Sequence, residues 1–155
     1  MEKFIIKLIV DNTKGVMARI ATLLSRKGYN ITSIAVGSHL EEGEASIMLT
    51  IWGNETEVEL AKNMLEKLIN VIDIHKYHES EVIEKEHCLL KIKKTESPVA
   101  KLNNKNVVVL RENEGIMVLE YIDHPDKVEA LITTAVKELD VLDISRSGTN
   151  AMSIK

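Results

Sequence analysis

The chain has 155 residues, 45% of them hydrophobic and 28% charged, as in a globular protein with one full domain or two small ones. Its formal net charge of −4 and its 3% of aromatic residues argue against a nucleic-acid surface, which needs a basic patch and stacking side chains. A single cysteine, Cys88, excludes an intramolecular disulfide and fits a cytoplasmic protein, and the apolar run at the N-terminus is too short to span a membrane.

The first half of the chain predicts the element order βαββαβ. Four apolar, β-rich runs predict strands at residues 4–10, 29–37, 45–52 and 71–77. A first helix is expected to begin after Gly15, at Val16, and to end before Gly28, because apolar residues recur there at helical spacing. A second helix follows a capping box formed by Asn54 and Glu57. This order is that of a ferredoxin-like unit, in which two helices cover one face of a four-stranded antiparallel sheet.

The second half repeats this order with one shortened element. Strands are predicted at 87–93, 106–111, 116–122 and 141–145, and a helix capped by Asp123 or His124 precedes the last of them. Between Lys94 and Asn106 the chain is too short for a full helix, and Pro98 permits at most a turn such as 99–102. The predicted fold class is therefore α+β, with two ferredoxin-like units at 1–80 and 81–155. The second unit lacks most of its first helix, so its sheet should be half uncovered.

The segment from Asp11 to Ile31 is the most informative stretch for function. It places a strand end, a polar loop, Gly15 and a helix N-terminus in succession. The free N–H groups at a helix start favour a carboxylate, and a glycine there leaves room for close approach. Asn12 offers both a donor and an acceptor, as recognition of a free amino acid requires. On spacing alone, an ordinary helix start explains the same residues, because many helices begin in this way.

Other residues that often carry chemistry have plainer explanations. His75, His78, His87 and Cys88 are zinc-ligand types, but His75 and His78 should point to opposite faces of a strand. We therefore expect no metal site, and we expect a buried core thiol at Cys88. The acidic hairpin turn at 41–44 is expected to be solvated rather than catalytic.

Three sequence blocks resemble the acetolactate synthase (acetohydroxyacid synthase) small-subunit family, whose members carry ACT domains. The first block joins N-x-x-G-x-x-x-R-I, which begins at Asn12, to R-x-G-Y-N-I, which begins at Arg26, and to S-I at 33–34. The second is E-K-E at 84–86 before L-L-K-I, and the third is R-S-G at 146–148. The blocks occur in the family's order and span almost the whole chain. The shortened part of the second domain departs from the family pattern.

The resemblance implies that the first ACT domain pairs edge to edge with its copy in another chain, giving a homodimer or a higher homo-oligomer. It also implies that a branched-chain amino acid, with valine as the first candidate, binds at the seam between the two copies. Carried over by motif, the amino-acid-binding residues are Asn12, Gly15, Val16, Met17, Asn30 and Ile31. Positions 16 and 17 are the more variable ones, so the preferred branched side chain stays open.

The resemblance further implies a regulatory subunit without a catalytic site of its own. Its partner would be the large catalytic subunit, on which alone thiamine diphosphate, Mg²⁺ and FAD are expected. The small subunit would activate that enzyme and make it sensitive to feedback in valine, leucine and isoleucine biosynthesis. Two alternatives stay open: a free-standing ACT sensor that regulates another enzyme or a transcription factor, and a small enzyme on the same scaffold. The E-K-E and R-S-G blocks argue against the sensor, because a generic ACT module needs neither.

Overall fold

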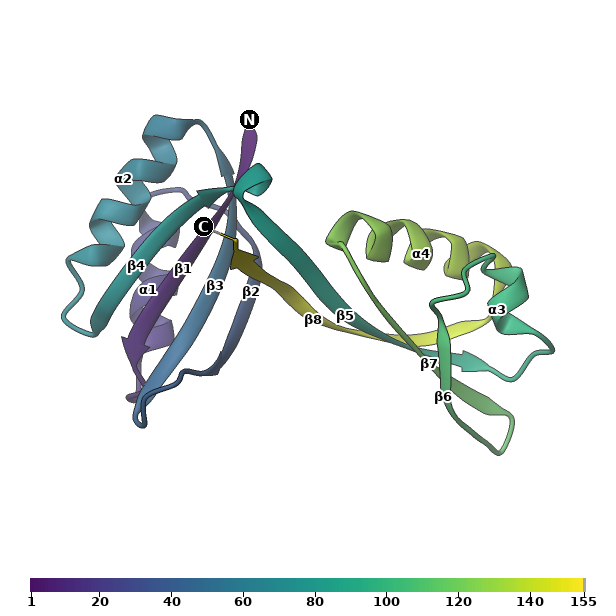
Figure 1. Ribbon diagram of the computed structural model, residues 1–155. Coiled ribbons are helices and arrows are strands. Elements are labelled where there is room, and N and C mark those ends of the chain that lie inside the picture. Colours follow the sequence, from purple (N-terminus) through teal and green to yellow (C-terminus); the bar gives the residue numbers. More distant parts are fainter. Residues whose placement is uncertain (155) are drawn as a thin grey trace. The chain divides into compact units, whose positions relative to one another are not determined.

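The computed structural model describes residues 1–154, which form two compact units (Figure 1). Unit 1 comprises Met1–Ile83 together with residues 149–154 of the described chain, and unit 2 comprises Glu84–Gly148. The sequence places the boundary between residues 80 and 81 and assigns every later residue to the second domain. The structure differs in that the C-terminal residues return to unit 1. Among the helices of the described chain, none is long and apolar enough to cross a membrane.

Unit 1 has the predicted βαββαβ order. Its elements are β1 (Glu2–Asp11), α1 (Val16–Arg26), β2 (Ile31–Ser38), β3 (Glu44–Gly53), α2 (Glu55–Glu66) and β4 (Val71–His78). The strand order in the sheet is β2-β3-β1-β4, and neighbouring strands are antiparallel. Both helices pack on one face of this sheet (Figure 1). The predicted capping box is present, because Glu57 N–H donates to Asn54 Oδ1 at 2.9 Å and Asn54 N–H donates to Glu57 Oε2 at 3.0 Å.

Alternation along the central strand explains how the helices of unit 1 are held. Phe4 and Leu8 of β1 point toward the helices and are at most 1% exposed. Ile20 and Leu24, one helical turn apart on α1, are fully buried in the same cluster. Burying each of these side chains stabilises the fold by roughly 1.5–3 kcal/mol relative to leaving it in water. The position of α1 on the sheet is therefore determined by this apolar face.

Unit 2 repeats the topology of unit 1. After a 3₁₀ turn (Glu79–Glu81) the elements are β5 (Val82–Lys93), α3 (Pro98–Lys101), β6 (Val108–Asn113), β7 (Ile116–Asp123), α4 (Pro125–Glu138) and β8 (Val141–Ser153). The sheet order is β6-β7-β5-β8, which corresponds strand by strand to that of unit 1. Of the two predicted caps for α4, His124 is the one used, since its Nδ1 accepts from Asp126 N–H at 3.3 Å.

Two strands are longer than the sequence predicts. β5 begins at Val82 instead of residue 87, and β8 continues to Ser153 instead of ending at 145. The early part of β5 does alternate, but the buried positions are Glu84 and Glu86, each 4% exposed. A search for apolar runs does not detect a strand whose inward side chains are carboxylates.

The shortened first helix of unit 2 is confirmed, since α3 is a single turn of four residues. Its place in the core is taken by Leu102 and Val107 of the following loop, which are 5% and 4% exposed. All six residues of β6 are exposed. Val109 pairs with the core residue Leu119 and therefore points to the helix face, yet it is 40% exposed. The sheet of unit 2 is thus uncovered at its β6 edge.

Candidate functional site

The loop between β1 and α1 has the conformation that its glycine predicts. Gly15 caps α1 with φ of +88°, a conformation that residues with a side chain rarely adopt. No side chain caps this helix end, and a Cβ built on Gly15 would meet nothing within 4 Å. Val16 N–H makes a long hydrogen bond of 3.5 Å to Thr13 O in the preceding loop. The N–H groups that follow in the first turn have no partner within the helix, so this end of α1 presents donors to an open space. Such an end favours an anion.

The loop is fixed by hydrogen bonds to two other turns. Asn12 N–H donates to Gly43 O at 2.7 Å, and Asp11 N–H donates to Asn70 O at 2.9 Å. The side chain of Asn70 accepts from Arg19 Nη1 at 2.6 Å and donates to Thr13 Oγ1 at 3.4 Å. Sequence analysis missed Asn70, because nothing but its place before β4 marks it. Its contacts connect the loop to the first turn of α1.

The structure divides the six predicted binding residues into two groups. Asn12, Gly15, Val16 and Met17 lie together at the start of α1. Asn30 and Ile31 lie where β2 begins, beyond the other end of α1. Since α1 has 11 residues at a rise of about 1.5 Å each, the two groups are separated by about 16 Å along the helix. A single copy of the chain therefore does not bring them to one amino-acid-sized ligand.

The side chains of these six residues differ in how far they are exposed to a ligand. Asn12 and Asn30 are exposed, whereas Met17 and Ile31 are half-buried against the edge of the core. Val16 is 5% exposed and packs inside unit 1, so it can offer a ligand its backbone but little of its side chain. A hollow of about 360 Å³ does lie along α1, lined by Ala18, Arg19, Thr22, Leu23, Arg26 and Leu68. It contains none of the six predicted residues.

Strand β2, which begins with Ile31 of the second group, lies at an open edge of the sheet of unit 1. β2 pairs only with β3, and within residues 1–154 no strand pairs with its other edge. Ile34 and Val36 of β2 pair with core residues of β3, yet they are 39% and 55% exposed. An exposed edge strand with apolar side chains is a site for pairing with another strand.

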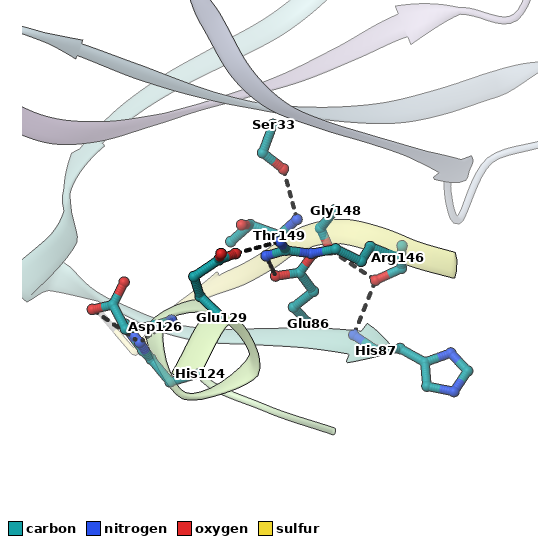
Figure 2. A network of polar contacts seen from close by, with 10 residues as sticks. Ser33, Glu86, His87, His124, Asp126, Glu129, Arg146, Gly148 and Thr149 are labelled. Atoms are coloured by element: carbon teal, nitrogen blue, oxygen red, sulfur yellow. Dashed lines mark hydrogen bonds and ion pairs between the residues drawn. The ribbon is translucent and has the colours of Figure 1, made fainter. Parts of the chain in front are cut away.

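The E-K-E and R-S-G blocks of the sequence meet in unit 2 (Figure 2). Arg146 donates from Nε and Nη2 to the two carboxylate oxygens of Glu86 at 2.9 and 2.8 Å, and from Nη1 to Glu129 at 2.6 Å. His87, the residue after the E-K-E block, donates from its backbone N–H to Ser147 Oγ of the R-S-G block at 3.0 Å. A two-pronged contact with a buried carboxylate fixes the register of β8 on β5. These blocks therefore have a structural role within unit 2.

A second charged cluster in unit 2 surrounds Asp123 at the end of β7. The backbone N–H of His124, at 2.8 Å, and Lys85 Nζ, at 3.0 Å, hold the pKa of this carboxyl well below its usual range. Tyr121 OH also donates to it, at 3.0 Å. The buried Glu84 pairs with His124 at 3.7 Å. Of these contacts, the ion pair of Lys85 with Asp123 joins β5 to β7.

His75 and His78 point to opposite faces of β4, as their spacing in the sequence predicts. His75 stacks on Tyr77 with ring centroids 6.0 Å apart, whereas His78 meets Phe4 of the core at 5.4 Å, on the opposite face of β4. Cys88 is fully buried, and burial raises the pKa of its thiol. In the described part of the chain no three His, Cys, Asp or Glu side chains gather in a way that could hold a metal ion.

Comparisons with known proteins point to one family. Residues 6–73 match a family model described as the AHAS small subunit-like ACT domain. A probable acetolactate synthase small subunit of Archaeoglobus fulgidus is 29% identical over 154 residues, which are 97% of this chain and 96% of that protein. The acetolactate synthase small subunit of Mycolicibacterium smegmatis is 26% identical over 152 residues, which are 96% of this chain and 89% of that protein.

A solved structure extends the likeness to the whole fold. The crystal structure of the acetolactate synthase small subunit from Thermotoga maritima superposes with a TM-score of 0.88, covering 100% of this chain and 99% of that one. The two sequences are 24% identical, so this comparison concerns the fold. It confirms the α+β arrangement of two ferredoxin-like ACT units.

Proposed function

Since the chain belongs, through its ACT domain at residues 6–73, to the acetolactate synthase small-subunit family, we propose that it binds a branched-chain amino acid and thereby regulates a catalytic partner. Family membership makes the chain a regulatory subunit. The amino acid, its site and its effect on the partner are the proposal. The observation that carries it is the start of α1 at Gly15, which no side chain caps, in a unit whose strand β2 pairs with β3 and has no strand along its outer edge within residues 1–154.

The start of α1 suits the carboxylate of an amino acid. The N–H groups of its first turn that have no partner within the helix, and the helix dipole, each favour a negative charge, with about 0.3–1 kcal/mol from the dipole at an exposed site. Gly15 leaves the approach open. The side-chain oxygen of Asn12 is an acceptor for the ligand's ammonium group, and Asn12 N–H, bonded to Gly43 O, keeps the residue in place. Met17 and Ile31 offer apolar surface to a branched side chain.

Two copies of unit 1 are needed to complete this site. In a βαββαβ unit β1 and β2 are parallel, so the end of β1 and the start of β2 lie at opposite ends of the sheet. Antiparallel pairing of β2 with β2 of a second copy reverses that copy about a two-fold axis. The start of α1 in one copy then faces Asn30 and Ile31 of the other. The same pairing covers Ile34 and Val36.

Regulation follows if the ligand binds two arrangements of this dimer unequally, because equal binding shifts no equilibrium. A coupling free energy of about 1–3 kcal/mol changes an affinity by roughly 5- to 150-fold. We propose as the partner the large catalytic subunit, which would carry the thiamine diphosphate, Mg²⁺ and FAD and form acetolactate from pyruvate. Valine is the first candidate for the effector.

Isothermal titration calorimetry of the purified chain with valine, leucine and isoleucine tests the binding site. We expect valine to bind and alanine, which has the same backbone groups but no branched side chain, to bind much more weakly. Light scattering after size-exclusion chromatography should show a dimer or a larger oligomer. No heat with any of the three amino acids, or a monomer at every concentration, would contradict the proposal.

The identity of the protein partner distinguishes a regulatory subunit from a free-standing sensor. A pull-down from native lysate should recover the catalytic large subunit, and adding the chain to that subunit should raise acetolactate formation and make it sensitive to valine. Recovery of a different enzyme or a transcription factor in place of the large subunit would favour the free-standing sensor.

A further inference from the structure

The end of β8 packs on unit 1. β8 has 13 residues, whereas its counterpart β4 has 8, and the part of β8 from Thr149 onward belongs to unit 1. Thr149 and Ala151 are 5% and 6% exposed, whereas Met152 is 63% exposed. This alternation shows that one side of the segment lies against unit 1. We call Thr149–Ser153 the C-terminal strap.

The strap is attached to the sheet of unit 1 by backbone N–H groups that donate to side chains. Thr149 N–H donates to Ser33 Oγ at 2.8 Å (Figure 2), and Ala151 N–H donates to Met48 Sδ at 3.0 Å. Met48 alternates with the core residues of β3 and so lies on the sheet face opposite the helices. A thioether is a weak acceptor, so the hydroxyl of Ser33 is the stronger of the two attachments.

Ser33 lies two residues after Ile31, on the strand that begins with the second group of proposed binding residues. The register of β2 on β3 shifts between Ile31 and Ser33, and Thr32 Oγ1 donates to Thr50 O at 3.2 Å within this irregular stretch. Such bulges bend a strand locally and change the direction of neighbouring side chains. Only Thr32 separates Ile31 from Ser33, so a displacement at the start of β2 moves the residue to which the strap is bonded.

At its upstream end the strap joins the R-S-G block. Arg146 is held by Glu86 and Glu129, and Ser147 Oγ accepts from His87 N–H. Gly148 has φ of +77° and is the last residue of unit 2. Arg146 and Ser147 thus fix β8 in unit 2, and Gly148 supplies the positive φ at the point where the strand passes into the strap.

From these contacts we propose that the C-terminal strap transmits ligand occupancy from the first unit to the second, and that Ser33 is its positioning residue. The inference rests on the proposed amino-acid site. A ligand that orders Asn30 and Ile31 changes the position of Ser33, and with it the hydrogen bond to Thr149 N–H. Because β8 continues without interruption from Arg146 into the strap, the change is passed along one strand.

The test uses Ser33→Ala in the full chain, assembled with the catalytic large subunit. The substitution removes the acceptor of Thr149 N–H while leaving the binding residues untouched. We expect the affinity for valine, measured by calorimetry, to stay within about twofold of the unchanged protein, since the ligand contacts remain. The valine concentration that half-inhibits the enzyme should rise by about fivefold or more, which is the lower end of typical allosteric coupling. Ser33→Thr keeps a hydroxyl and should restore the response.

Ser38→Ala is the matched control, because it removes a hydroxyl from an exposed position at the far end of the same strand. Amide hydrogen exchange of the free chain gives a second readout: Ser33→Ala should speed exchange at Thr149 and leave the core of unit 1 protected. Normal inhibition in Ser33→Ala would overturn the role of the strap, and so would loss of valine binding in that variant. If the unchanged protein binds none of the three amino acids, the proposed function fails first and this inference with it.

Discussion

The two units share a strand order but differ in the helix that follows their first strand. In unit 1, α1 has 11 residues and contributes Ile20 and Leu24 to the core. In unit 2, α3 has four residues, and loop residues such as Leu102 fill the core instead. The sheet topology therefore does not require the helix. A site at a helix start does require it, because a single turn has almost no dipole. This difference confines the proposed ligand site to unit 1.

The largest expected effect is on the free energy of unfolding, and it compares a core covered by a helix with a core covered by a loop. Leu24→Ala should lower the free energy of unfolding by about 3–5 kcal/mol, because it leaves a cavity under a rigid helix. Leu102→Ala should cost about 2 kcal/mol, because the loop can collapse into the space. Urea unfolding followed by the fluorescence of Trp52, the single tryptophan, reports on unit 1. Amide exchange reports on unit 2, and equal losses would mean that the loop packs as rigidly as α1.

The next effect compares a buried ion pair with an exposed one. Arg146→Ala leaves Glu86, whose side chain is 4% exposed, without its cation and should destabilise unit 2 by about 3 kcal/mol. Lys76→Ala in unit 1 should cost less than about 1 kcal/mol, because its partners Glu55 and Glu59 are 68% and 42% exposed. Thermal unfolding of both variants checks the difference. Adding Glu86→Gln to Arg146→Ala should recover part of the loss, whereas no recovery would argue against an unpaired buried charge as its cause.

A third effect concerns ligand binding alone. Gly15→Asp puts a negative charge where a carboxylate is proposed and places a side chain at a positive φ. We expect valine to bind with about 2 kcal/mol less free energy, roughly a 30-fold rise in Kd, while activation of the large subunit is kept. Gly115→Asp is the control, because Gly115 has a similar φ of +81° in unit 2 and equally open surroundings. Unchanged inhibition curves for Gly15→Asp would refute the site.

The smallest effect is a difference in acid sensitivity. The pKa of Asp123 is depressed by His124 N–H and Lys85, so its stabilisation is present above about pH 4 and is lost as the pH falls below that value. In unit 1, Lys76 lowers the pKa of Glu59, but this carboxyl is exposed and contributes little. Asp123→Asn should cost about 1–2 kcal/mol at pH 7 and make the stability of unit 2 less dependent on pH in acid. A pH dependence unchanged in this variant would place the acid sensitivity elsewhere.

What could be predicted from the sequence depended on the range of the interaction. The element order, the capping box of Asn54 and the shortened helix after Lys93 follow from residues close together in the chain, and the structure confirms them. Contacts over long separations were missed. Asn70 holds a loop almost sixty residues before it, and Thr149 binds Ser33 across 116 positions. Neither contact leaves a periodic pattern in the sequence, so neither could be found by reading along it.

The strand β8, which starts in unit 2 and finishes in unit 1, also determines when the protein can be completed. Synthesis on the ribosome proceeds from the N-terminus, so unit 1 emerges first but lacks the strand that covers Ser33 and Met48. That strand emerges only after all of unit 2. The part proposed to sense the amino acid is therefore finished last, and a nascent chain cannot acquire its coupled form before both halves have been made.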